Sequence, residues 1–315
     1  MNVLITGGAG FIGSNLADRL ISEGHKVVII DDLSTGRQEN VNEKATFVKG
    51  SIVDVNACRA AFELARTDVI VHAAASYKDP DGWMKDANVN TLGTINVIKT
   101  AKEFGFVRRL IYFQTSLCYG REPKESPITL DHPINPNNSY AITKVAGERF
   151  IELSGLDFVS FRLANCYGPR NLSGPIPTFY QKLTKGEKCF VSDSRRDFVY
   201  IDDLLDIVMA AISGTGQGYY HVATGSDYAI QEVFDIIRAQ LEVEELITPV
   251  PSEYIGRFWD DVKTILLDPS RTTHDFGIVP STQLASGLEK ALEWYKEHGV
   301  TETYTHLKQK EPDKN

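Results

Sequence analysis

Apolar residues in the first half of the chain follow two alternating patterns. Short runs rich in β-branched residues alternate with longer segments whose apolar residues recur three and four positions apart, as in buried strands and helices. We expect strands at Asn2–Thr6, Lys26–Ile30, Thr46–Lys49, Asp68–His72, Arg108–Phe113 and Asp157–Arg162. We expect helices at Phe11–Ser22, Val55–Ala65, Met84–Phe104 and Tyr140–Leu153. The alternation predicts an α/β fold, with a doubly wound parallel sheet whose strands are joined by crossover helices.

The pattern changes after Arg162. The segment from Asn165 to Pro175 is rich in turn-forming residues, and shorter elements follow it. Helices are expected at Asp202–Ile212, Ile230–Leu241 and Leu284–His298. We assign residues 1–165 to the first domain, with a return of the chain to it around 196–225. Residues 166–195 and 226–315 are assigned to a smaller C-terminal α/β lobe that closes a cleft.

Charge and hydropathy exclude several classes of partner. The 315 residues include 33 Lys and Arg against 42 Asp and Glu, a net charge of −9. A net-negative surface does not attract a nucleic-acid backbone or an anionic membrane. No apolar run approaches the roughly 18 residues of a membrane-spanning helix, and Met1–Thr6 lacks the features of a secretory signal. We therefore expect a cytoplasmic protein, with neither nucleic acid nor membrane as partner.

The four cysteines indicate no structural crosslink. They are widely spaced and form no CxxC pair, and they are Cys58, Cys118, Cys166 and Cys189. This spacing argues against a disulfide framework and against a zinc site. We expect free thiols and no metal.

A glycine-rich turn follows the first expected strand. Gly7, Gly10 and Gly13 lead directly into an apolar-periodic helix. Such glycines bring the backbone close to a pyrophosphate, and the helix N-terminus attracts its negative charge. The second strand runs into Asp31, 18 residues beyond Gly13, which is the spacing of a dinucleotide-binding site. Asp31 would accept hydrogen bonds from ribose hydroxyls and repel a 2′-phosphate, which favours NAD over NADP. Arg37 could host such a phosphate, although its usual role is that of a solvated loop charge.

A tyrosine and a lysine four residues apart indicate acid/base chemistry. Tyr140 and Lys144 lie on an expected helix, where residues at this spacing share a face. An ammonium beside a phenol favours the phenolate and lowers the tyrosine pKa, so that Tyr140 could take a proton from a substrate hydroxyl. Such pairs also occur by chance, but this one follows a complete dinucleotide motif.

Eight motifs occur in order along the chain. They are TGGAGFIG at Thr6–Gly13, DDLSTG at Asp31–Gly36, HAAA at His72–Ala75, NVNTLGT at Asn88–Thr94, TSLCYG at Thr115–Gly120, YAITK at Tyr140–Lys144, RLANCYGPRN at Arg162–Asn171 and RRDFVYIDD at Arg195–Asp203. In this order and spacing the chain resembles the extended short-chain dehydrogenase/reductases, in particular the NAD-dependent nucleotide-sugar epimerases and dehydratases. The resemblance implies a Rossmann sheet with a C-terminal substrate lobe.

The resemblance also implies a set of cofactor contacts. The residues are Gly7, Gly10, Phe11, Ile12, Asp31, Asp32, Ser34, Gly36, Ser51, Ile52, Ala73, Ala74, Ala75, Asn90, Tyr140 and Lys144. Asn90 is expected to brace the sheet near the cofactor. Related enzymes usually have Asp before Ile at the adenine, where this chain has Ser51 before Ile52, so the adenine contact differs here.

The family's catalytic Ser or Thr corresponds to Thr115, which is 25 residues before Tyr140. Ser116 is adjacent, and because neighbouring strand residues point to opposite faces, at most one of the two should face the substrate. The residues after Thr115 are Ser116 and Leu117, where related dehydratases carry an acidic pair. The resemblance therefore implies 4-epimerisation with NAD regenerated in each cycle.

The substrate implied is a nucleotide-diphosphate sugar, held by Arg196 and Asn165, with Lys78 a further contact. The chain looks most similar to UDP-sugar 4-epimerases of the O-antigen and surface polysaccharide branch. A homodimer is expected, through the helices near Asn90–Glu103 and Tyr140–Leu153. The alternatives are a dehydratase, decarboxylase or 4-reductase of the same family, or a non-catalytic NAD-sensing protein.

Overall fold

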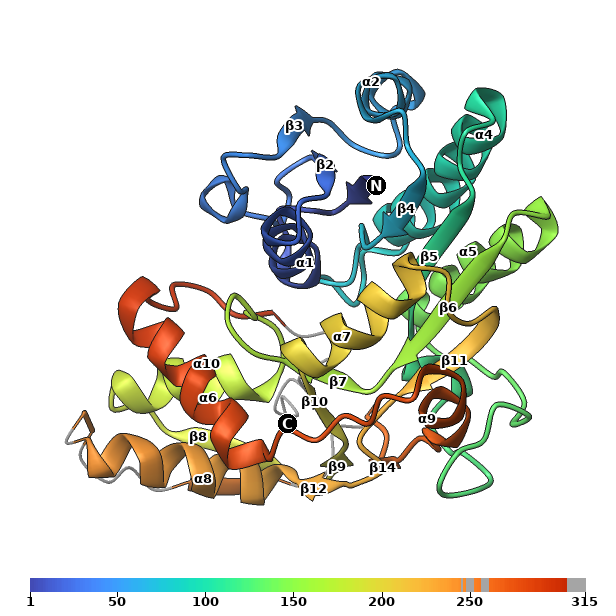
Figure 1. Ribbon diagram of the computed structural model, residues 1–315. Helices are drawn as coiled ribbons and strands as arrows, with labels where there is room; N and C mark the ends of the chain where they lie inside the picture. The colour runs from blue at the N-terminus through green and yellow to red at the C-terminus, as the bar shows by residue number, and fades with distance from the viewer. Residues whose placement is uncertain (245, 248–251, 256–260, 305–315) are drawn as a thin grey trace.

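The computed structural model in Figure 1 describes residues 1–244, 246–247, 252–255 and 261–304. Within them, seven parallel strands form one sheet in the order β11-β6-β5-β4-β1-β2-β3. The strands are β1 (Asn2–Thr6), β2 (Lys26–Asp31), β3 (Thr46–Lys49), β4 (Val69–His72), β5 (Arg109–Thr115), β6 (Phe158–Leu163) and β11 (Gly218–Val222). The strand order reverses direction between β1 and β4, which confirms the predicted doubly wound α/β fold.

Alternate residues of the central strands supply two separate hydrophobic cores, one on each face of the sheet. Val3 and Ile5 pack into one core, and Leu4 between them packs into the other. The first core includes α1 (Phe11–Ser22) and α7 (Ile201–Ile212); the second includes α2 (Val55–Ala65), α4 (Thr94–Phe104) and α5 (Ser139–Ser154) (Figure 1). Because helices cover both faces, the carboxyl ends of the strands remain to build a site.

The expected helix Met84–Phe104 is three segments in the structure. These are α3 (Trp83–Asp86), the π-helical segment η2 (Ala87–Gly93) and α4. Gly93 ends the π segment where a Cβ would lie 2.6 Å from the Ile52 side chain. Apolar spacing of three and four residues does not distinguish a π turn from an α turn, so the sequence predicted one continuous helix.

The remaining elements form the smaller lobe and its connections. The strands pair as β7 (Asn165–Tyr167) with β10 (Phe198–Tyr200), β8 (Cys189–Ser192) with β13 (Ser252–Ile255), and β9 (Arg195–Arg196) with both β12 (Tyr228–Ala229) and β14 (Thr264–Ile265). The helices are α6 (Pro175–Thr184), α8 (Ile230–Val243), α9 (Ser270–Phe276) and α10 (Leu284–His298), and the short 3₁₀ turns of the chain are η1 (Gln38–Asn40) and η3 (Ser116–Tyr119). The sequence did not predict α6, which begins at Pro175, the last residue of the turn-rich segment.

The chain returns to the main sheet at β11, which pairs with β6 at the sheet edge. The division into two lobes at residue 165 stays a prediction, and residues 305–315 of the predicted lobe lie outside the described residues. None of the described helices has the length and hydropathy needed to cross a lipid bilayer.

Candidate active site

One large pocket opens at the carboxyl ends of the parallel strands, with a volume of about 1030 Å³, and its lining residues run from Gly7 to Ile265 along the chain. Gly7, Ala73 and Thr115 line it at the ends of β1, β4 and β5. Open α/β sheets bind ligands at this edge, next to the point where the strand order reverses. In the described part of the chain, no cluster of His, Cys, Asp or Glu could hold a metal ion.

The glycine turn forms a cradle that fits a dinucleotide pyrophosphate. Gly7 has φ +71°, and a Cβ at this position would lie 2.6 Å from the backbone nitrogen of Ala74. A Cβ on Gly13 would lie 2.4 Å from the carbonyl oxygen of Gly7. No side chain caps the N-terminus of α1, and its first residues Phe11 and Ile12 line the pocket. The first N–H groups of the helix and its dipole therefore face a site without side-chain bulk.

Asp31 is held rigidly at the end of β2. Its carboxylate accepts the N–H of Ala9 at 2.9 Å and the N–H of Leu33 at 2.8 Å, and burial raises its pKa. The expected neighbours Asp32, Ser34, Ser51 and Ile52 also line the pocket. Gly36 does not: a Cβ there would lie 2.9 Å from Ala9 and 3.0 Å from Asp31, so the glycine lets the loop pack behind this carboxylate.

Asn90, expected among the cofactor residues, also lies behind the pocket wall. Its side chain accepts the N–H of Ser76 at 2.8 Å and donates to the Ser76 carbonyl at 2.9 Å and to Thr143 Oγ1 at 3.0 Å. It therefore ties the loop after β4 to α5. Ala73, Ala74 and Ala75, by contrast, line the pocket.

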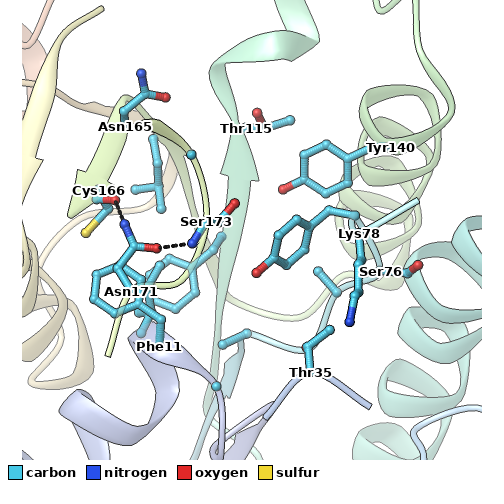
Figure 2. A pocket seen from close by; sticks show the side chains of 18 of the residues that line it. Phe11, Thr35, Ser76, Lys78, Thr115, Tyr140, Asn165, Cys166, Asn171 and Ser173 are labelled. Carbon is cyan, nitrogen blue, oxygen red and sulfur yellow. Dashed lines mark hydrogen bonds between the residues drawn. The ribbon is translucent and has the colours of Figure 1, made fainter. Parts of the chain in front are cut away.

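The three residues expected to be catalytic all line the same pocket. Figure 2 shows Thr115 at the end of its strand, beside the ring of Tyr140. Asn138 caps α5 by accepting the N–H of Ala141 at 2.8 Å, and this fixes where the helix carrying Tyr140 and Lys144 begins.

Contrary to expectation, strand alternation does not separate Thr115 from Ser116. Strand β5 extends two residues beyond the expected Phe113 and ends at Thr115, so Ser116 belongs to η3 and strand alternation does not apply to it. Both residues line the pocket. The N–H of Leu117 donates to Thr115 Oγ1 at 3.2 Å, which leaves the Thr115 hydroxyl hydrogen available to a ligand.

The pKa values in the structure also differ from expectation. Burial raises the pKa of Tyr140, as do Tyr77 and Asp86, rather than Lys144 lowering it. Instead burial lowers the pKa of Lys144 to about 7, while the charge of Glu148 opposes this. The cause is that the lysine side chain is itself almost fully buried, at 2% exposure.

Four residues were expected to bind substrate, namely Lys78, Thr115, Asn165 and Arg196, and all four line the pocket. Figure 2 shows Asn165 and Lys78 on opposite sides of it. Arg196 donates to the Val262 carbonyl at 2.8 Å and forms a short ion pair with Asp261, which is 2% exposed. Lys78 lies 3.4 Å from Glu302 and over the ring of Tyr304 at 4.0 Å, so the segment ending at Tyr304 reaches the pocket rim.

Sequence reasoning missed several lining residues. They are chiefly Tyr77, Lys85, Ser173, Thr178, Phe179, Lys182 and Phe190. Tyr77 is next to Lys78, and its ring lies 6.1 Å from that of Tyr140. The residues on α6 follow helical spacing, which would have been the signal for them.

The chain belongs to the NAD dependent epimerase/dehydratase family, whose sequence model matches residues 3–223. This confirms the predicted family and its NAD cofactor. The chain is similar to the UDP-glucose 4-epimerase of Mycolicibacterium smegmatis, at 34% identity over 94% of this chain and 99% of that protein.

Two solved structures from Bordetella bronchiseptica are also similar. The enzyme WbmH in complex with NAD+ is 46% identical, with a TM-score of 0.90, over 95% of this chain and 99% of that chain. The enzyme WbmG in complex with NAD and UDP is 41% identical, with a TM-score of 0.88, over 98% of this chain and 99% of that chain.

Proposed function

We propose that this protein is an NAD-dependent nucleotide-sugar 4-epimerase that acts on a UDP-sugar. One observation carries the proposal: Thr115, Tyr140 and Lys144 line a single pocket with the glycine cradle and with Asn165 and Arg196. The similarity to a UDP-glucose 4-epimerase and to an enzyme crystallised with NAD and UDP supports it.

The side chains divide the work of proton transfer and charge stabilisation. Tyr140 accepts the proton of the sugar O4 hydroxyl as a phenolate, which must form against the effect of burial on its pKa, and later returns that proton. Thr115 hydrogen-bonds the same oxygen. The ammonium of Lys144 stabilises the Tyr140 phenolate and can also hold a ribose hydroxyl. NAD, when bound, supplies the hydride acceptor and donor for C4. Asn165 and Arg196 hold the diphosphate while the keto sugar turns to present its other face.

The residues after Thr115 favour epimerisation over elimination. Dehydration needs an acid to move a proton to the leaving hydroxyl, and the 3₁₀ turn that follows contains Ser116, Leu117, Cys118 and Tyr119. Among the described residues, the carboxylates that line the pocket are Asp31 and Asp32 at the β2 end and Asp261, which is paired with Arg196. Within the described residues, therefore, no carboxylate that could act as the acid lines the pocket beside Thr115.

Incubation with UDP-, dTDP- and GDP-sugars, followed by NMR of the C4 proton, tests the function. We expect C4 inversion to equilibrium with a UDP-sugar, without net formation of NADH. A 4-keto-6-deoxy product would instead identify a dehydratase, and stoichiometric NADH would identify an oxidoreductase.

We further propose a homodimer that works in the cytoplasm, in surface polysaccharide synthesis. Leu92, Ile142, Phe150 and Leu153 are large apolar side chains exposed on η2 and α5, the region expected to form a helix bundle with a second copy. The four cysteines form no disulfide, which agrees with a reducing compartment. The resemblance to the O-antigen branch supports the pathway. Light scattering of the unaltered protein and of Leu153→Glu tests the dimer: the unaltered protein should have twice the chain mass, and the variant one chain mass.

A further inference from the structure

Glu148 lies one helical turn beyond Lys144 on α5 and belongs to a buried polar cluster. Tyr140, Lys144 and Glu148 follow at intervals of four residues and so share one face of α5. Glu148 is 0% exposed. The motif that predicted the site ends at Lys144, and the reaction proposed above gives Glu148 no part.

Two side chains on the neighbouring strand hold the Glu148 carboxylate. Ser160 Oγ donates to Glu148 Oε1 at 2.5 Å, and Arg162 Nη2 donates to Glu148 Oε2 at 3.0 Å. Arg162 Nη1 also donates to Tyr119 Oη at 2.9 Å, and the guanidinium lies over the Tyr219 ring at 4.7 Å. The carboxylate is therefore fixed between α5 and β6.

The Lys144 ammonium lies over an aromatic ring. Its Nζ is 3.9 Å from the centroid of the Tyr112 ring on β5. His72 on β4 is neutral there, because burial and the charge of Lys144 lower its pKa to about 3. Tyr140 is neutral at its raised pKa. Glu148 is thus the acidic group whose charge opposes the effect of burial on the pKa of Lys144.

Asp86 on α3 acts on Tyr140, and Glu152 on α5 acts on Arg162 and Tyr219, but among the described residues Glu148 is the anion that acts on Lys144. On η3, burial raises the pKa of Cys118 and of Tyr119, so both are neutral. On β11, burial raises the pKa of Tyr219 to about 12. Burial lowers the pKa of Arg162 on β6, but Glu148, Tyr119 and Cys118 raise it by a larger amount. The guanidinium therefore stays charged.

We propose that Glu148 is a positioning residue: its carboxylate, fixed by Ser160 and Arg162, keeps Lys144 as a buried ammonium at the reaction site. The proposal rests on the function above, in which Lys144 acts as a cation beside Tyr140. Without the carboxylate, the described residues would offer Lys144 no negative charge to oppose the effect of burial on its pKa. The charge state of the lysine is therefore set from behind the pocket by a group that touches no substrate.

The test is the pH dependence of unfolding in Glu148→Gln, an amide of nearly equal shape. A buried lysine with a lowered pKa makes the folded protein more stable as pH rises, because the unfolded chain binds more protons. Loss of the carboxylate should lower the pKa of Lys144 further, by about one pH unit. Glu148→Gln should have a lower free energy of unfolding than the unaltered protein, and this deficit should shrink as pH rises from about 6 to about 8. In a Lys144→Met background, the same substitution should give a deficit that does not vary over this range.

Asp157→Asn is the matched control. Asp157 pairs with Arg109 at 2.8 Å at the other end of strands β5 and β6, so its loss should leave the pH dependence unchanged. If Glu148→Gln fails to fold, Glu148→Gln/Arg162→Met removes both charges of the pair, and its pH dependence is compared with and without Lys144→Met. A deficit that is constant with pH, or one that persists without Lys144, overturns the proposal. The unfolding measurement needs no substrate. If Glu148→Gln shows the expected pH dependence of unfolding but the unaltered protein epimerises no sugar, the positioning role of Glu148 is supported and the proposed function is overturned.

Discussion

Tyr112 contacts Lys144 at both ends of the lysine residue. The ammonium lies 3.9 Å from the centroid of the Tyr112 ring, and the Tyr112 hydroxyl donates to the Lys144 carbonyl oxygen at 3.0 Å. The ring face attracts the cation, and the hydrogen bond anchors the α5 backbone to β5. Gly147 makes this approach feasible, because a Cβ there would lie 2.9 Å from the same hydroxyl. A strand residue outside the pocket lining therefore contacts both the ammonium and the backbone of the lysine.

The first prediction concerns pH. Lys144 has a pKa of about 7 and acts as a cation, so kcat/KM should fall as pH rises above about 7. Lys144→Arg should remove this alkaline limb, because arginine stays protonated. The measurement is kcat/KM of the NAD-loaded protein from pH 5.5 to 9.5. An alkaline limb that persists in the arginine variant would assign it to another group.

The second prediction concerns the general base. Tyr140→Phe should lower kcat by about 10²- to 10⁴-fold, the usual contribution of a positioned acid/base, while NAD still binds. Turnover and NAD titration by calorimetry are the readouts. Tyr77→Phe is the matched comparison, because its phenol ring lies 6.1 Å away in the same pocket. A larger loss of kcat in Tyr77→Phe than in Tyr140→Phe would reverse the assignment.

The third prediction concerns the glycine cradle. Gly7→Ala should weaken NAD binding, because the new Cβ would lie 2.6 Å from the Ala74 backbone in the pocket wall. Gly24→Ala is the control: its φ of +81° is also positive, but nothing lies within 4 Å of the new Cβ. Both substitutions should destabilise folding by about 1 kcal/mol through backbone strain. Calorimetric titration should detect weaker NAD binding in Gly7→Ala alone, and equal affinities would contradict the cradle.

The fourth prediction concerns the diphosphate. Arg196→Gln/Asp261→Asn removes the lining guanidinium and its buried partner together, so that no unpaired charge remains. We expect KM for the nucleotide sugar to rise by about 10- to 100-fold, as for a lost charged hydrogen bond, with a smaller change in kcat. Arg195→Gln is the adjacent control, since Arg195 pairs with Asp227 at 2.7 Å and does not line the pocket. An unchanged KM in the double variant would remove Arg196 from the substrate site.

Much of the fold follows from short-range patterns in the sequence. Short β-branched runs and helical spacing located the six expected strands and the main helices, with shifts of one or two residues at several ends. The helix Leu284–His298 has its expected bounds. Where two backbone geometries share an apolar pattern, as in η2, spacing could not choose between them. The short strands of the smaller lobe carry too few residues for any period to show.

The candidate site divides in the same way. The glycine turn, Asp31 and the pair Tyr140 and Lys144 could be recognised because each depends on residues close together in the chain. Pairing of Arg196 with Asp261, or of Lys78 with Glu302, joins residues 65 and 224 positions apart, which no local pattern encodes.

The fold class, the cofactor and the candidate residues for proton transfer were readable from the chain, since spacing along a strand or helix directly fixes which side chains share a face. The protonation states of these residues could not be read from the chain. Whether Lys144 lowers the pKa of Tyr140, or has its own pKa lowered, depends on how many atoms from distant segments exclude water around it. That exclusion arises when α5 packs against β5 and β6, so the electrostatics of the site belong to the folded protein.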